Sequence, residues 1–258
     1  MEALYTVPTT ILSAVFLGLL LLAIEVGIRV FVFKRAEGAE ASGGTFGVVL
    51  GAVLALLGLL LAFSFSMSAA RYDARRVLQV QEANAIGTLY LRADLLDDTQ
   101  RDALRKQVRD FTDLRLAIHD AKDREQAATL ARQTSATQEK IWAIVTTAAR
   151  DAPETHAMSL LVSAANDVFD ISTARTASYR AHVTEVIPLM IVIVSLISAL
   201  LIGASGGPVN QRNWLAMLAF ASTLTIVLFA ILDLDRPRQG LIQIPQTLMQ
   251  ELRDSMGP

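Results

Sequence analysis

Four long apolar stretches divide the chain into membrane and water-facing parts. Residues 3–24 carry no charged side chain, and neither do residues 41–70. Residues 186–201 and 213–232 form the third and fourth apolar stretches. A helix rises 1.5 Å per residue, so about twenty apolar residues cross a hydrocarbon core of roughly 30 Å. We therefore predict four transmembrane helices.

The spacing of these stretches also predicts a topology. Short connections join the first two spans and the last two, which favours two antiparallel hairpins. The division is then 1–70 for the first hairpin, 71–185 for an insert, 186–235 for the second hairpin and 236–258 for a C-terminal tail. Basic residues near the span ends in the insert and tail are Arg71, Arg75, Arg76, Arg175, Arg180, Arg236, Arg238 and Arg253, against Lys34, Arg35 and Arg212 in the short loops. The positive-inside rule places the insert in the cytoplasm, with both termini on the same side of the membrane.

The insert has the pattern of amphipathic helices. It is rich in good helix formers, and its apolar stripe has spacings of 4, 3, 3 and 4. The stripe consists of Leu104, Val108, Phe111, Leu114 and Ile118. Asp97 or Asp98 can cap this helix, and Asp-Ala-Pro-Glu at 151–154 has the composition of a second helix start. We expect two insert helices to continue from membrane helices without a break, and an all-α fold overall. Such a stripe usually forms core or a subunit contact.

Composition supports the membrane class and excludes several functions. Hydrophobic residues make up 53% of the chain and charged residues 19%, with a mean hydropathy of +0.43. The net charge of −2 and the lack of a basic run exclude the usual nucleic-acid footprint. The chain has no cysteine, and His119, His156 and His182 lack metal-ligand spacing. Nothing in the sequence predicts a catalytic residue, a metal site or a cofactor.

Two groups of ionisable residues lie near span ends. Glu25 and Arg29 share one face near the end of the first span, which indicates either an intramembrane functional pair or two side chains that reach the interface. At the end of the fourth span the chain reads Asp233-Leu-Asp-Arg-Pro-Arg-Gln-Gly240. Its charged members, Asp233, Asp235, Arg236 and Arg238, form a solvated ion-pair cluster on the simplest interpretation. The alternative is a cation or gating site, although two carboxylates supply only part of a Ca²⁺ shell.

Several segments resemble one known family. They are Leu60-Leu-Ala-Phe-Ser-Phe65, Arg71-Tyr-Asp-Ala-Arg-Arg76, Glu82-Ala-Asn-Ala-Ile-Gly87 and the segment from Asp233 to Gly240. Together they resemble a bestrophin-like family of bacterial membrane proteins that is distantly similar to the bestrophins, and the resemblance covers nearly the whole chain. Bestrophins are pentameric anion channels, with some cation-conducting bacterial members, and their second membrane helix lines a hydrophobic neck. Their dense acidic run is reduced here to Asp233 and Asp235, so the resemblance does not imply calcium control.

The resemblance implies an oligomeric channel or passive pore for small inorganic ions, most simply anions. Leu59, Phe63 and Ser66, spaced 4 and 3, would line it, and a ring of such residues can gate by dewetting. An alternative register offers Gly58, Ala62 and Ser66. The cytoplasmic mouth would consist of Arg71, Tyr72, Asp73, Arg75 and Arg76, whose arginines would concentrate anions.

Two other functions stay open. The chain could be a non-conducting scaffold or signalling protein whose insert binds a partner. Less simply, it could be a transporter that uses Glu25 and Arg29.

Overall fold

The structure is a computed structural model in which every described secondary-structure element is helical. It describes residues 7–36, 43–121, 123–151, 156–180, 186–205, 213–236 and 240–257, and no strand occurs among them. Contacts group the chain into two compact units. Met1–Tyr72 and His182–Gln243 form the first unit, and Asp73–Ala181 and Ile244–Pro258 form the second. The predicted all-α fold is confirmed for this described part.

The first unit contains the apolar helices. They are α1 (Thr9–Ala36), the first part of α2 (Gly43–Arg92), α6 (Val186–Ser205) and α7 (Trp214–Leu234). Each is long and apolar enough to cross a membrane, so the structure has four candidate spans at the positions that the sequence predicts. The two connections expected to close the hairpins lie largely outside the described residues, so the hairpin arrangement stays a prediction.

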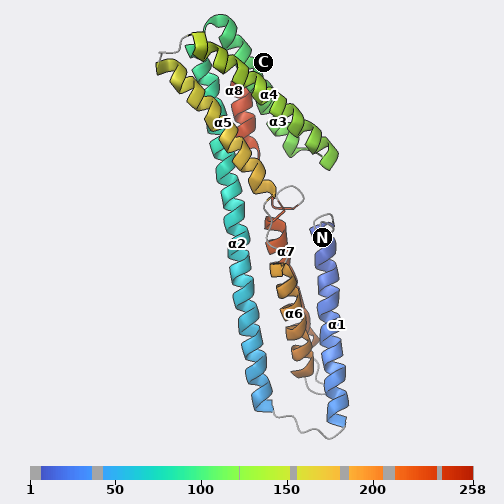
Figure 1. The fold of residues 1–258 in the computed structure, drawn as a ribbon. Helices are drawn as coiled ribbons and strands as arrows, with labels where there is room; N and C mark the ends of the chain where they lie inside the picture. Colours follow the sequence, from blue (N-terminus) through green and yellow to red (C-terminus); the bar gives the residue numbers. More distant parts are fainter. Residues whose placement is uncertain are drawn as a thin grey trace. The chain divides into compact units, whose positions relative to one another are not determined.

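Helix α1 packs against both α6 and α7, side by side in Figure 1. Small residues set the distance between α1 and α6. A methyl group on Gly27 would collide with the carbonyl oxygen of Leu200, and one on Gly203 would collide with that of Ile24. Ala199 and Ser195, one and two turns before Gly203, are also fully buried. Small residues at a four-residue spacing allow membrane helices to approach closely.

Helix α2 continues without a break from the first unit into the second, as predicted for the second span. Its most apolar window is only 6% buried, against 28–33% for the other candidate spans. The apolar part of α2 therefore receives the least cover from its own chain.

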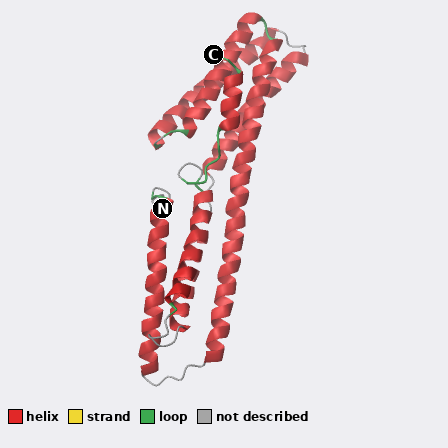
Figure 2. Cartoon of the chain, turned by 180° about the vertical axis from the view of Figure 1, so that it is seen from behind, coloured by secondary structure: helices red, strands yellow, loops and turns green. Residues whose placement is uncertain are grey.

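The second unit is a helical bundle with an apolar core of its own. It contains the end of α2, the short 3-10 turn η2 (Ala93–Leu95), α3 (Asp98–His119), α4 (Arg124–Asp151), α5 (His156–Arg180) and α8 (Thr247–Ser255). Figure 2 shows its described residues as helices and loops only. As predicted, Asp97 caps α3: its side chain accepts a hydrogen bond of 2.9 Å from the Gln100 amide.

The predicted apolar stripe of α3 faces the core of the second unit. Leu104, Val108 and Phe111 are fully buried, and Leu114 and Ile118 are half-buried. The helix start expected at 151–154 lies mostly outside the described residues. So does the expected run from the insert into the third span, at 181–185.

The C-terminal segment belongs to the same core. Helix α8 packs against α3, and Met249 and Met256 are buried in the cluster that contains Leu104 and Phe111. The part of the chain that the sequence set apart as a tail is thus divided by contacts after Gln243, and its last portion completes the second unit.

Candidate functional site

The residues predicted to line a pore lie together on one exposed face of α2. Leu59 is 52% exposed and Phe63 is 64% exposed, and Ser66 is also exposed. Leu57 and Ser64, on the opposite side of the helix, are buried. This alternation follows from 3.6 residues per turn, because positions separated by 4 and 3 return to the same side. The face is an apolar surface with one hydroxyl, free of cover from its own chain.

The alternative register lies on nearly the same face. Gly58 and Ala62 are exposed beside Leu59 and Phe63. A methyl group on Gly58 would meet no atom within 4 Å. Small side chains therefore alternate with large apolar ones on this face, and both registers share Ser66.

The charged positions after this face do not all reach solvent. Asp73 and Arg76 are exposed, and Arg71 and Tyr72 are half-buried. Arg75 is only 2% exposed, and its Nε donates a hydrogen bond of 3.2 Å to the backbone carbonyl of Ser178 on α5. Arg75 thus holds α2 against α5 and differs from the surface cation expected for a channel mouth.

Glu25 and Arg29 form the contact that their spacing allows. The Nε of Arg29 lies 2.9 Å from Oε1 of Glu25. The side chain of Arg29 is 77% exposed and that of Glu25 is 27% exposed. The pair therefore lies at the surface of this chain, near the end of the apolar part of α1.

Asp233 organises the end of α7. Its Oδ1 accepts a hydrogen bond of 3.0 Å from the amide of Leu241, and its Oδ2 accepts one of 2.8 Å from the amide of Ile242. Gly240 lies against this carboxylate: a methyl group there would be 2.9 Å from Cγ of Asp233. A carboxylate that binds two backbone amides acts as the anchor of a turn.

Two further members of this cluster, Asp235 and Arg236, are buried rather than solvated. Asp235 is buried, and Arg236 donates from Nη1 to the backbone carbonyl of Val7 and, at 3.4 Å, to Oγ1 of Thr9. Arg238 lies outside the described residues. No group of three or more acidic, histidine or cysteine side chains that could hold a metal occurs in the described ranges. The described geometry is that of a structural junction between the ends of α7 and α1.

A buried charge cluster in the second unit is absent from the sequence predictions. Glu82 on α2 is fully buried and pairs with two guanidinium groups. Oε1 of Glu82 lies 2.8 Å from Nε of Arg115 on α3, and Oε2 accepts a hydrogen bond from Nη1 of Arg175 on α5. One feature of the sequence could have indicated this cluster. A single face of α2 carries the polar residues Arg75, Gln79 and Glu82 and then the apolar residues Ile86 and Leu89, and all five are buried.

The surroundings shift the pKa values of the two arginines of this cluster in opposite directions. Burial lowers the pKa of Arg115, with the carboxylate of Glu82 opposing and the charge of Arg175 adding to the decrease. Burial also acts to lower the pKa of Arg175, but Glu82 and Tyr179 raise it more, so its pKa lies above the ordinary value. Arginine stays protonated in proteins, so both groups are permanent donors.

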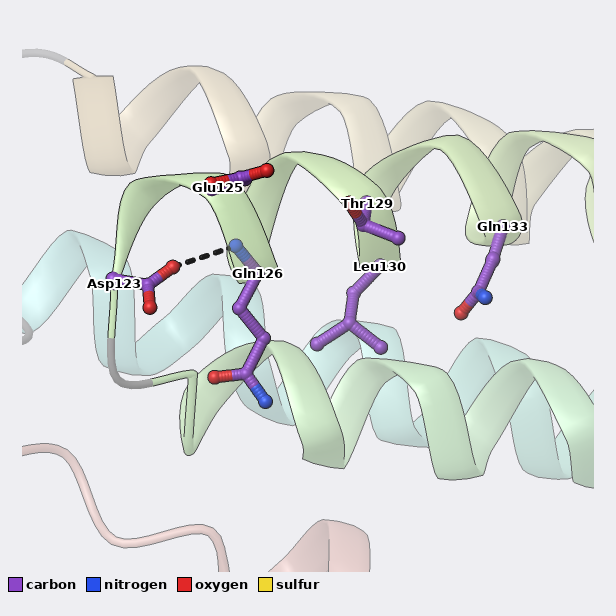
Figure 3. A pocket seen from close by; sticks show the side chains of 6 residues that line it. All are labelled: Asp123, Glu125, Gln126, Thr129, Leu130 and Gln133. Atoms are coloured by element: carbon purple, nitrogen blue, oxygen red, sulfur yellow. Dashed lines mark hydrogen bonds between the residues drawn. The ribbon is translucent and has the colours of Figure 1, made fainter.

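A surface hollow of about 380 Å³ lies at the start of α4. Figure 3 shows the side chains that line it, which are Asp123, Glu125, Gln126, Thr129, Leu130 and Gln133. Asp123 accepts a hydrogen bond of 2.7 Å from the Gln126 amide. One of the two acidic residues in the lining therefore caps helix α4. The hollow is formed by successive turns of one exposed helix start.

Comparison with known proteins places the chain in a family. The sequence profile of the bestrophin-like domain matches residues 10–249. The chain belongs to the bestrophin-like family. No functionally curated protein matches it.

Solved bestrophin structures share the fold. The crystal structure of a bacterial bestrophin homologue from Klebsiella pneumoniae, solved by Zn-SAD phasing, has a TM-score of 0.72 and 14% identity, covering 94% of this chain and 96% of that one. A point mutant of a Klebsiella pneumoniae homologue gives a TM-score of 0.70 and 13% identity, over 94% and 98%. A mutant described only as a membrane protein gives 0.72 and 12%, over 95% and 99%. At these identities the comparison shows that the chain shares the bestrophin fold.

Proposed function

We propose that this bestrophin-like protein forms an oligomeric pore for small inorganic ions, with the exposed face of α2 lining it. The observation that carries the proposal is the exposure of Leu59, Phe63 and Ser66 together on the apolar helix with the least cover from its own chain. A single chain cannot enclose an axis with one helix face. Several copies around an axis, with a pentamer as the expected arrangement, would turn this face into a ring.

The chemistry of such a ring suits a gate. Leu59 and Phe63 would form apolar constrictions, where water leaves readily and ions lose their hydration, and Ser66 would offer a hydroxyl one turn further along. Opening and closing would then depend on small changes in the width of an apolar neck.

Anions are the class that we propose, because of the charges at the water end of this helix. Arg76 is exposed and Arg71 is half-buried, against the single exposed carboxylate of Asp73. Positive charge at a mouth raises the local anion concentration. Arg75 makes no contribution to this surface, because its side chain is buried.

The proposal includes an orientation. We place the protein in the bacterial inner membrane, with the insert and both termini in the cytoplasm. The excess of arginine in the insert and tail supports this orientation under the positive-inside rule. Cysteine labelling from each side of the membrane, at positions in this cysteine-free chain, tests it directly.

Reconstitution in liposomes tests conduction. The purified full-length protein should give a chloride flux above that of empty vesicles. Phe63→Ala should raise this flux by widening the neck, and Ser66→Trp should reduce it by filling the ring. Ile226→Ala on α7, an equally exposed apolar position on another span, serves as the control and should leave the flux unchanged.

Failure has a clear signature. A flux equal to that of empty vesicles, together with a monomeric mass in a mild detergent, would reject the pore and favour the scaffold or signalling protein.

A further inference from the structure

The C-terminal segment 244–257 is fastened to the second unit by polar contacts along its length. They are Gln79 Nε2 to the Pro245 carbonyl at 2.8 Å, Tyr90 Oη to the Met256 carbonyl at 2.7 Å and Arg253 Nε to Asp113 Oδ1 at 2.7 Å. These contacts involve α2 and α3. One further attachment, at Gln246, involves a histidine.

Gln246 stands in the middle of a polar relay of four side chains, Glu82, Arg175, Gln246 and His119. Arg175 donates to Glu82 through Nη1 and, through Nη2 at 3.2 Å, to Oε1 of Gln246. Nε2 of Gln246 lies 3.2 Å from Nδ1 of His119. Gln246 is buried and His119 is half-buried, so this end of the relay has little water to replace a lost partner.

The direction of the hydrogen bonds is forced by the arginine. A guanidinium has donors only, so the atom of Gln246 that faces Arg175 has to be the amide oxygen. The amide nitrogen, also a donor, then faces His119. Nδ1 of His119 therefore has to accept a hydrogen bond, which only the neutral imidazole can do. The charge of Glu82 holds Arg175 in place and so fixes the orientation of the amide.

We propose that His119 and Gln246 form an acid-sensitive attachment that holds the C-terminal segment to the second unit at neutral pH and weakens when His119 is protonated. When Nδ1 of His119 is protonated, its N–H group faces the NH₂ group of Gln246, so two donors face each other with no acceptor between them. Rotating the amide of Gln246 gives no relief, because its NH₂ group would then face the guanidinium of Arg175. Either the imidazole of His119 or the segment that carries Gln246 then has to move, and the hydrogen bond between them is lost in both cases.

The sign of the pH effect follows from linkage. The released state binds one more proton than the attached state, so attachment is strongest above the ordinary histidine value of about 6.5 and is lost as the pH falls below it. The described charged and titratable groups around the relay are Glu82 on α2, Arg115 on α3, Asp120 directly after α3, and Arg175 and Tyr179 on α5. The segment before α8 contributes the neutral Gln246. Histidine is the member of this set whose ordinary titration falls between pH 5 and 8.

Hydrogen exchange measured by mass spectrometry on the full-length protein in detergent tests the proposal. The readout is the protection factor of amides 247–257, corrected for the intrinsic pH dependence of exchange. Wild type should lose about tenfold in protection per pH unit below the histidine value, by the linkage relation. His119→Gln keeps a side-chain acceptor that does not titrate, so its protection should stay constant with pH. This readout requires no ion conduction, so it stands or falls independently of the proposed pore.

A second variant reverses the expected sign. In Gln246→Glu a carboxylate accepts from both Arg175 and protonated His119, so acid should increase protection of the segment. His156→Gln, at an exposed histidine on α5, should behave as wild type. A wild-type profile without a pH response, an unchanged response in His119→Gln, or a Gln246→Glu variant that loses protection in acid would each overturn the proposal.

Discussion

The backbone of Gly240 lies against the carboxylate of Asp233, which leaves no room for a side chain between them. This contact allows both oxygens of Asp233 to reach the amides of Leu241 and Ile242. Asp233 thereby fixes the backbone of Leu241 and Ile242 beside the end of α7 and satisfies both of their amide donors. Both residues belong to the segment from Asp233 to Gly240 that the sequence analysis identified. In the structure, Asp233 and Gly240 have a structural role at the end of α7.

Gly240→Ala should lower the stability of the first unit. The added methyl group would lie 2.8 Å from the Asp233 carbonyl oxygen, so the turn has to open and at least one amide loses its partner. Overpacking of this kind costs about 1–3 kcal/mol. The melting temperature in detergent should fall. Gly58→Ala, where the methyl group meets nothing, is the control, and equal melting temperatures for the two variants would contradict the role assigned to Gly240.

The crossing of α1 and α6 makes a second stability prediction. Gly27→Ala and Gly203→Ala should each force the two helices apart, because each methyl group would collide with a backbone carbonyl of the other helix. We expect a cost of about 1–3 kcal/mol for each. Gly18→Ala on the same α1 adds a methyl group in open space and should be neutral. Thermal unfolding in matched detergent compares all three, and a Gly18→Ala loss as large as that of Gly27→Ala would rule out the crossing as the cause.

Removing the charge of Glu82 should destabilise the second unit severely. Glu82→Gln leaves Arg115 and Arg175 buried with no carboxylate between them, and breaking a buried pair by removing one partner costs about 3–5 kcal/mol. The pair of Lys106 and Asp110, 2.7 Å apart and exposed, supplies the control. Asp110→Asn should leave stability nearly unchanged, because exposed pairs contribute little. Chemical denaturation followed by helix content measures both, and similar midpoints would show that the buried cluster is dispensable.

The contact between Glu25 and Arg29 separates a pore from a transporter. In the proposed pore this pair lies on α1, away from the exposed face of α2, so Glu25→Gln should leave chloride flux within the range of wild type. A transporter that uses the pair would lose its transport with this substitution. Single-vesicle flux assays on wild type and Glu25→Gln decide between the two, and a collapse of flux in the variant would count against the pore.

Much of the fold could be predicted from the sequence, because it depends on local patterns of apolar and polar residues. The four spans were predictable because lipid demands long uncharged runs, and the α3 stripe because one helix face is buried. That Leu59, Phe63 and Ser66 share one face of α2 followed from helical spacing. The burial of Arg75 did not, because it depends on the approach of α5, whose Ser178 lies 103 positions away in the chain.

The charge cluster around Glu82 was out of reach for the same reason. Arg175 is 93 positions from Glu82, and no local spacing joins them. The unusual feature in the sequence was a set of polar residues on the same face of α2 as Ile86 and Leu89. A simple amphipathic helix would have only apolar residues on its buried face. Conflicts of this kind between a polar side chain and a buried face indicate long-range pairing, although they leave the partner unnamed.

The burial of Met249 and Met256 in the second unit has a practical consequence for producing the protein. Cutting the chain after Gln243 would uncover the apolar side of α3 and deprive Gln79 and Tyr90 of their backbone acceptors. Such a fragment should be sensitive to proteases and prone to aggregate, even though every membrane helix is intact. Expression designs that shorten the chain should therefore keep α8 and the residues up to Met256.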